Sequence, residues 1–116
     1  MITIVPYDTD WPEQFMLVAR PLRAALGDLA LRIDHIGSTS VPDLAAKDII
    51  DVQITVADFA CTPQLVTLLG TLGYTQAPGI VSDHVPPLYE GPATDWEKRY
   101  FRQPADLRPM HLHVRA

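Results

Sequence analysis

Apolar residues recur at spacings of three and four across residues 11–26, and this periodicity predicts one amphipathic helix. Asp10 occupies the expected N-cap position, and Glu13 is placed to complete a capping box. Gly27 marks the expected end of the helix. Pro21, inside the periodic pattern, predicts a kink or an early break.

Two apolar runs predict the central strands of a sheet. Residues 29–36 read as a half-buried strand and residues 49–56 as a more deeply buried one. A second helix is expected from Thr62 to Gly73, and the Pro- and Gly-rich segment 78–94, with His84 and Tyr89 as surface residues, should be an irregular loop or an edge hairpin. Further short strands are expected at residues 2–5, 74–77, 96–102 and 110–114.

The resulting order, β-α-β-β-α-β-β-β, predicts an α+β fold with a mixed or antiparallel sheet and helices packed mainly on one face. No repeat or long linker divides the chain, so a single domain spanning residues 1–116 is expected. Helices on one side leave the opposite face open, and candidate site residues should project from that face or from its edge.

Composition narrows the functional classes. The 116 residues are 47% hydrophobic and 20% charged, which is typical of one small globular domain. A net charge of -5 disfavours a nonspecific grip on nucleic acid. Cys61 is the only cysteine, which excludes an intrachain disulfide and a cysteine zinc site. Neither a basic leader nor an apolar run of about 20 residues is present, so we expect a cytoplasmic protein without a membrane span.

A glycine and hydroxyl turn after the first central strand is the first candidate site. Glycine permits close backbone approach to a phosphate, and the following N–H and hydroxyl groups form an anion-binding nest. An ordinary turn is the alternative. Basic residues that would offset phosphate charge are Lys47, Arg99 and Arg102, although a solvated strand face also explains the last two. The turn comprises Gly37, Ser38, Thr39 and Ser40.

Asp51 stands alone in the apolar run of the second central strand, where an unpaired carboxylate would be costly to bury. It is a candidate metal ligand, and pairing with Arg32 or Lys47 is the alternative. Two-metal phosphoryl transfer needs a second carboxylate two residues further along the strand. That position is the neutral Gln53, which stays a ligand-binding candidate.

Two histidines, His111 and His113, share one face of the last strand, opposite its apolar residues. Alternate strand positions place two imidazoles side by side, as a transition-metal site requires. A third ligand would come from Asp51, His35 or His84. A hydrogen-bonded pair without metal is the alternative interpretation.

Segments 5–12, 35–52 and 111–114 together resemble the GrpB family, and the motif Ile-Gly-Ser-Thr-Ser-Val-Pro is specific for it. That family is similar in fold to nucleotidyltransferases, whose pattern is a Gly-Ser turn followed by a strand with paired acids. The resemblance places the turn at Gly37 and Ser38 and the first metal-binding acid at Asp51.

The resemblance implies binding of a nucleotide or another phosphorylated small molecule, with Mg²⁺ and with Asp51 as the catalytic residue if nucleotidyl groups are transferred. A non-catalytic accessory module is the alternative, favoured by Gln53 in place of the second acid. The fusion of similar domains to dephospho-CoA kinase in some actinobacteria implies a link of this module to nucleotide or coenzyme A metabolism. A third hypothesis is a metal-dependent hydrolase that uses His111, His113 and Asp51.

The chain departs from the family pattern at Asp43 and Asp48, where relatives commonly have Gly and Pro. We expect Asp48 to pair with Lys47 or to add a carboxylate to the rim of the site. Relatives also usually continue into a helical segment beyond the residue that corresponds to Ala116. If that helix covers an apolar sheet face in relatives, a partner chain must hide the same face in this protein, and we therefore expect a homodimer.

Overall fold

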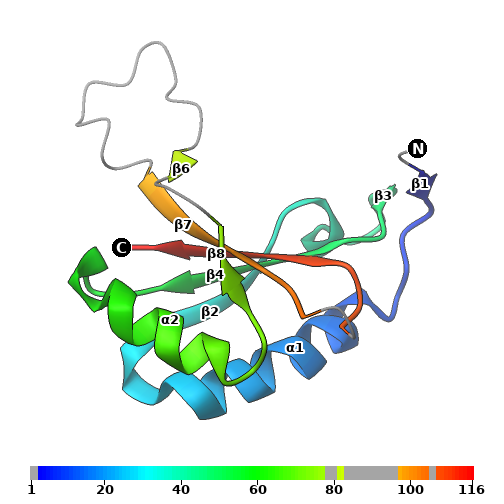
Figure 1. The fold of residues 1–116 in the computed structure, drawn as a ribbon. Helices are drawn as coiled ribbons and strands as arrows, with labels where there is room; N and C mark the ends of the chain where they lie inside the picture. The colour runs from blue at the N-terminus through cyan, green and yellow to red at the C-terminus, as the bar shows by residue number, and fades with distance from the viewer. Residues whose placement is uncertain (1–2, 78–80, 83–96, 105–106) are drawn as a thin grey trace, which may run out of the picture.

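A mixed, mostly antiparallel sheet carries two helices on one face (Figure 1), which confirms the predicted α+β fold. The computed structural model describes residues 3–77, 81–82, 97–104 and 107–116. Short 3-10 turns cover Gly27–Leu29, Ser38–Ser40 and Phe59–Cys61. The helices and strands are β1 (Ile4–Val5), α1 (Trp11–Leu26), β2 (Arg32–Ile36), β3 (Ala46–Lys47), β4 (Ile50–Thr55), α2 (Thr62–Gly70), β5 (Thr75–Gln76), β6 (Val81–Ser82), β7 (Glu97–Arg102) and β8 (Met110–Arg115).

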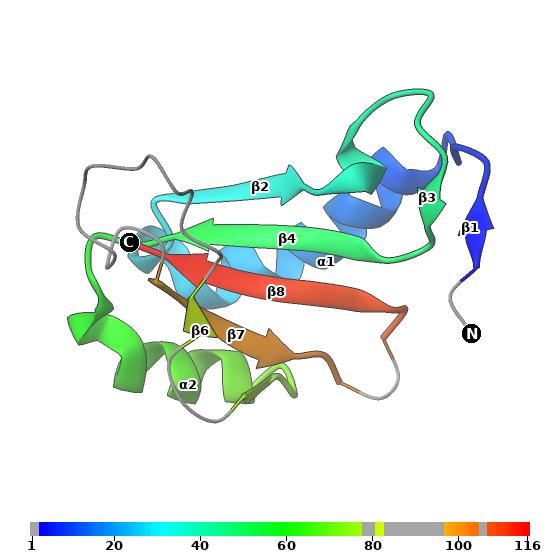
Figure 2. The same cartoon turned by 90° about the horizontal axis from the view of Figure 1, so that it is seen from above.

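The sheet has the strand order β2-β4-β8-β7-β5, with β6 paired to β7 (Figure 2). Its central pair, β4 and β8, is parallel, and the other pairs are antiparallel. The register of the central pair sets Asp51 opposite His111 and Gln53 opposite His113. A separate two-stranded unit, β1 with β3, lies at one end of the sheet.

Helix α1 has the predicted bounds, but the expected capping box and the early break at Pro21 do not occur. Asp10 is the N-cap residue, yet its side chain makes no capping hydrogen bond, so the expected capping box does not form. The helix also runs through Pro21 without ending. Proline leaves the carbonyl of Leu17 without its helical partner. Leu17 is 55% exposed, so water can satisfy that carbonyl.

The core lies between the helices and one face of the sheet. Along β4 and β8, every second residue is buried, which is the alternation expected for strands with one covered face. Helix α2 contributes Leu65 and Leu69, and each fully buried leucine stabilises the fold by roughly 1.5–3 kcal/mol. The buried strand residues are Ile50, Val52, Ile54, Met110, Leu112 and Val114, joined by Phe101 of β7.

Element ends differ from expectation where short turns intervene. Helix α2 ends at Gly70 instead of Gly73, which lies in the following turn at φ +89°. Strand β2 begins only at Arg32, because Gly27–Leu29 forms a 3-10 turn that uses the first residues of the apolar run. His84 and Tyr89 lie outside the described residues.

The uncovered face of the sheet is mostly polar. Strand alternation and register place on it Asp34, Ile36, Asp51, Gln53, Tyr100, Arg102, His111 and His113. Among the described residues, this face therefore offers no broad apolar surface that a partner chain must hide, and the homodimer stays a prediction. Within the same part of the chain, neither helix has the length and hydropathy that crossing a membrane requires.

Candidate functional site

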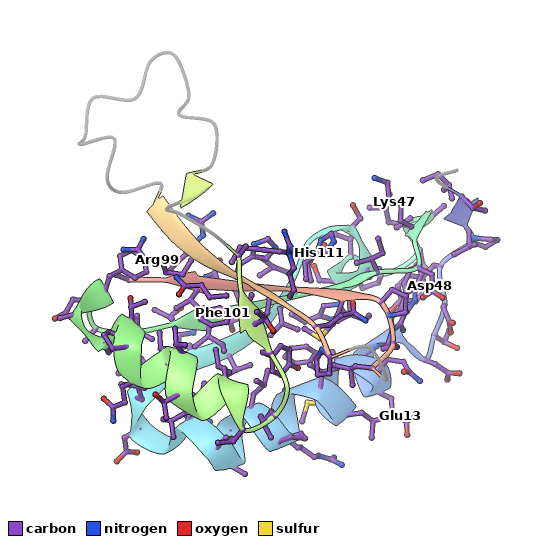
Figure 3. All side chains as sticks on the ribbon, in the orientation of Figure 1. Glu13, Lys47, Asp48, Arg99, Phe101 and His111 are labelled. Carbon is purple, nitrogen blue, oxygen red and sulfur yellow. The ribbon has the colours of Figure 1, made fainter. Side chains whose placement is uncertain are left out.

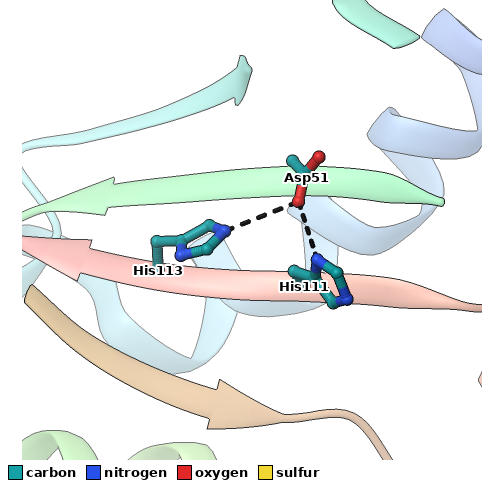
Figure 4. Close-up of side chains that lie close together, drawn as sticks. All are labelled: Asp51, His111 and His113. Carbon is teal, nitrogen blue, oxygen red and sulfur yellow. Dashed lines mark hydrogen bonds and ion pairs between the residues drawn. The ribbon is translucent and has the colours of Figure 1, made fainter. Parts of the chain in front are cut away.

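Asp51 and two histidines meet on the open face of the central strand pair (Figure 4). Asp51 Oδ1 lies 3.1 Å from His111 Nδ1 and 3.5 Å from His113 Nε2. The partners of the Asp51 carboxylate are thus these imidazoles, and the sequence-based alternative of Arg32 or Lys47 is wrong. Arg32 instead pairs with Asp34 at 3.0 Å.

The environment favours the ionised form of Asp51. Burial raises the pKa of the Asp51 carboxyl, but the hydrogen bond from His113 and the nearby imidazoles lower it by more, so its pKa lies below the usual value. A carboxylate only accepts hydrogen bonds, so the imidazoles of His111 and His113 are the donors in these two contacts. The Nδ1 atom of His113 is buried and has no hydrogen-bond partner among the described residues.

Gly37 lets the turn approach Asp51 closely. Its φ is +74°, and a Cβ atom at this position would lie 2.5 Å from Asp51 Oδ2. Glycine is therefore required both by the backbone conformation and by the space that the carboxylate occupies. The turn and the acid, which the sequence indicated separately, form one packed unit.

The hydroxyl groups of the turn have different roles. The Ser40 side chain and backbone N–H both donate to the Gly37 carbonyl, so they hold the turn together and are not available to an anion. Thr39 is 2% exposed, and its hydroxyl donates to the Ile49 carbonyl. The hydrogen bonds of Thr39 and Ser40 therefore stabilise the turn, while phosphate binding by Thr39 stays a prediction because this residue also lines the pocket beside Asp51.

His35 lies on the helix-covered side of the sheet and is not the third member of the cluster. Its ring stacks on Phe15 with centroids 5.0 Å apart, and its Nε2 lies 2.9 Å from Thr39 Oγ1. Burial lowers the pKa of His35, and the charge of Asp51 offsets only part of that effect. His35 thus links strand β2 to the turn as a neutral side chain.

A pocket of about 280 Å³ opens beside the cluster, between the main sheet and the β1–β3 pair. Lys47 is the one lysine or arginine among the described residues that line it. Figure 3 shows Lys47 and His111 on the side of the sheet away from the helices. The lining consists of Ile4, Ser38, Thr39, Ala45, Ala46, Lys47, Ile49, Asp51 and His111.

The remaining ligand-binding candidates are dispersed. Gln53 lies on the open face between Asp34 and His113 in the strand register. Arg102 lies on the same face, opposite Thr75 of β5, but does not line the pocket. Arg99 shares its strand face with the buried Phe101, and its guanidinium lies 4.1 Å from the centroid of the Phe59 ring. Arg99 therefore does not belong to the site, contrary to the sequence-based expectation.

Asp48 has a structural role that the sequence did not reveal. Asp48 accepts a hydrogen bond of 2.9 Å from Trp11 Nε1. It also forms an ion pair with Arg108, and not with Lys47 as expected. The hydrogen bond from Arg108 and then that from Trp11 hold the pKa of Asp48 below its usual value. This carboxylate therefore ties the start of β4 to α1 and to the segment before β8.

Tyr100 is a neighbour of the cluster that sequence reasoning missed. Its ring centroid lies 5.8 Å from that of His111 and 5.6 Å from that of His113. Burial, together with the charge of Asp51, raises the pKa of Tyr100, so it stays a neutral phenol. The alternation of residues 96–102 could have indicated this position, because it puts Tyr100 on the strand face opposite that of Phe101.

The fold and site define an α+β domain with an acid and two histidines on its open sheet face. A family model described as GrpB protein matches residues 1–116, and the chain belongs to the GrpB family. This agrees with the resemblance seen in the sequence motifs. The crystal structure of the conserved protein GrpB from Enterococcus faecalis superposes with a TM-score of 0.68 and 30% identity, covering 97% of this chain and 61% of that one.

Curated relatives are longer proteins. A dephospho-CoA kinase of Mycolicibacterium paratuberculosis is 36% identical over 127 residues, which are 99% of this chain and 31% of that protein. The UPF0157 protein BH1888 of Halalkalibacterium halodurans is 41% identical over 97 residues, covering 81% of this chain and 48% of that protein. The chain thus spans 31% of the length of the first of these relatives and 48% of the second.

Proposed function

We propose that this domain binds a phosphorylated small molecule, with nucleotides as the first class to test, in the pocket beside Asp51. The observation that carries the proposal is the meeting of Lys47, Ser38 and the Asp51–His111 pair around one pocket. Lys47 supplies positive charge, and the Ser38 hydroxyl can donate a hydrogen bond to a phosphate oxygen.

The charge of the pocket supports a bound cation. Asp51 is ionised and lines the same pocket as Lys47, so a phosphate entering there meets one negative and one positive side chain. A divalent cation at Asp51 would turn that repulsion into attraction by bridging the carboxylate and the phosphate. We therefore expect ligand affinity to depend on a divalent metal ion.

The size of the pocket indicates that it encloses only part of the ligand. The volume of about 280 Å³ is at the lower end of the roughly 300–1,000 Å³ typical of small-molecule sites. We expect the phosphate end of the ligand to enter this space. The remainder of the ligand would lie along the polar open face.

Two-metal nucleotidyl transfer with Mg²⁺ fits this donor set poorly. That chemistry uses paired carboxylates to bridge two cations. Here the second position of the strand is Gln53, and the groups beside Asp51 are imidazoles. The proposal is accordingly one of metal-dependent binding, in which Asp51 is a metal ligand, and it includes no transfer step.

Isothermal titration calorimetry with ATP, dephospho-CoA and inorganic phosphate, with and without divalent metal, tests the proposal. Lys47→Ala should weaken binding about 10- to 100-fold, because a charge-assisted hydrogen bond contributes roughly 1.5–3 kcal/mol. Arg20→Ala, which removes one positive charge from exposed α1, is the matched control and should leave affinity unchanged. Equal affinity in the wild type and the Lys47 variant would refute this pocket as the binding site.

An accessory role in coenzyme A metabolism is the second candidate. It is favoured by the relatives named dephospho-CoA kinase, in which a region like this domain makes up 31% of a longer protein. In that case the domain binds dephospho-CoA or coenzyme A without converting it. Product formed from a nucleoside triphosphate by the isolated domain would count against this candidate.

A further inference from the structure

We infer that Asp51, His111 and His113 bind one transition-metal ion, of the class of Zn²⁺ or Ni²⁺, instead of the Mg²⁺ that a nucleotidyltransferase-like fold implies. The inference deepens the proposed function by naming the cation of the same site. The inference rests on the proposed function only where a phosphorylated ligand joins the metal ion. Binding of the metal ion itself can be measured without that ligand.

The positions of the ligand atoms fit a single ion. One oxygen of Asp51 and one nitrogen from each histidine lie within 4.8 Å of one another. Two ligands bound at about 2.0–2.1 Å in a tetrahedral arrangement are themselves about 3.3 Å apart. The separations from Asp51 Oδ1, 3.1 Å to His111 and 3.5 Å to His113, match that spacing, and the separation between the two imidazole nitrogens is within 4.8 Å.

The chemistry of the ligands selects the metal. Imidazole nitrogen suits Zn²⁺, Fe²⁺, Ni²⁺ and Cu²⁺, whereas Mg²⁺ requires oxygen ligands in a near-ideal octahedron. Two of the three groups here are imidazoles, and the strand position that would add a second carboxylate is Gln53. This set is a two-histidine, one-carboxylate arrangement, which disfavours Mg²⁺ and leaves coordination positions open.

The scaffold holds the three side chains in a fixed relation. They project from adjacent parallel strands, and Asp51 lies directly opposite His111. Close approach of Gly37 to Oδ2 limits rotation of the carboxylate, so Oδ1 stays directed at the histidines. Asp51 and His111 also line the pocket, so the remaining positions of the ion are reached from the proposed ligand site.

Equilibrium dialysis of the untagged chain against Zn²⁺, Ni²⁺ and Mg²⁺, without nucleotide, tests the inference. One Zn²⁺ or Ni²⁺ should bind per chain at least 100-fold more tightly than Mg²⁺. His111→Ala should weaken that binding at least 100-fold, and its 44% exposed side chain makes it the variant least disruptive to folding. Asp51→Asn should have a similar effect, whereas Asp34→Asn, which removes a carboxylate from the same face, should have none.

Two sets of outcomes separate the inference from the proposed function. Mg²⁺ binding as tight as Zn²⁺ binding, or unchanged Zn²⁺ affinity in folded His111→Ala and Asp51→Asn, would overturn the inference. Tight ligand binding in the presence of EDTA would refute the metal dependence of the proposed function and would leave only a metal-independent phosphate pocket. If metal binding depends on the cluster but no phosphorylated ligand binds, the proposed function is refuted and the metal inference stands.

Discussion

Replacing Gly37 by alanine tests whether the turn and the candidate metal ligand form one unit. The substitution adds a Cβ at a backbone φ of +74° and ψ of -171°, a region occupied almost entirely by glycine. The same Cβ would lie 2.5 Å from Asp51 Oδ2, well inside the normal contact distance. Either the turn or the carboxylate must therefore move.

The expected cost has two parts. Backbone strain at such an angle contributes about 1–3 kcal/mol. Moving the Asp51 carboxylate weakens its contacts with His111 and His113, and each hydrogen bond is worth about 1 kcal/mol. The total is about 3–5 kcal/mol, which a small domain with a stability of roughly 5–15 kcal/mol can lose and still fold.

Urea unfolding followed by the fluorescence of the fully buried Trp11 measures this cost. Gly27→Ala is the matched control, because Gly27 has φ +53° but open space around its Cβ position, so it reports backbone strain alone. In an Asp51→Ala background, the cost of Gly37→Ala should fall by about 2 kcal/mol, the coupling expected of residues in contact. Equal costs in the two backgrounds would refute the proposed packing of the turn on the carboxylate.

Three further substitutions test the fold around the site. Asp43→Gly relieves a positive φ of 65° and should raise the free energy of unfolding by about 0.5–1 kcal/mol; an unchanged or lower value in urea would contradict this. Folding lowers the pKa of His35, so the unfolded chain takes up a proton first as pH falls through 6.5, and stability should drop there. His35→Gln should show a smaller drop in urea midpoint between about pH 8 and about pH 5, and an equal drop would exclude His35 as the cause. Phe101→Ala should cost about 3–5 kcal/mol in the same assay, because the ring is fully buried; a loss below about 1 kcal/mol would contradict that burial.

Sequence patterns predicted the elements whose signals are local. The bounds of α1 follow from apolar spacing and from Gly27, and the faces of β4 and β8 follow from strict alternation. Pairing was not predicted, because the parallel contact of β4 with β8 joins segments about 60 residues apart. The continuation of α1 through Pro21 was missed because periodicity does not reveal whether water reaches the carbonyl of Leu17.

The candidate site shows the same division. Asp51, His111 and His113 were identified from residue type and alternation, but only the strand register brings them together. Arg99 was misassigned because its strand has polar residues at both parities, so the sequence does not show which face is covered. Asp48 was paired with its neighbour in sequence, although its partner Arg108 is 60 residues away.

The parallel pairing of β4 with β8 determines when the cluster of Asp51, His111 and His113 forms during folding. His111 is 60 residues beyond Asp51, so the cluster exists only after the last strand has docked between β4 and β7. Contacts of such long range form slowly, because a large loop must close first. A ligand at 100 times its Kd would add about 2.7 kcal/mol to the stability of the whole domain. Substitutions that loosen the docking of β8 would therefore weaken ligand binding even where they touch no site residue.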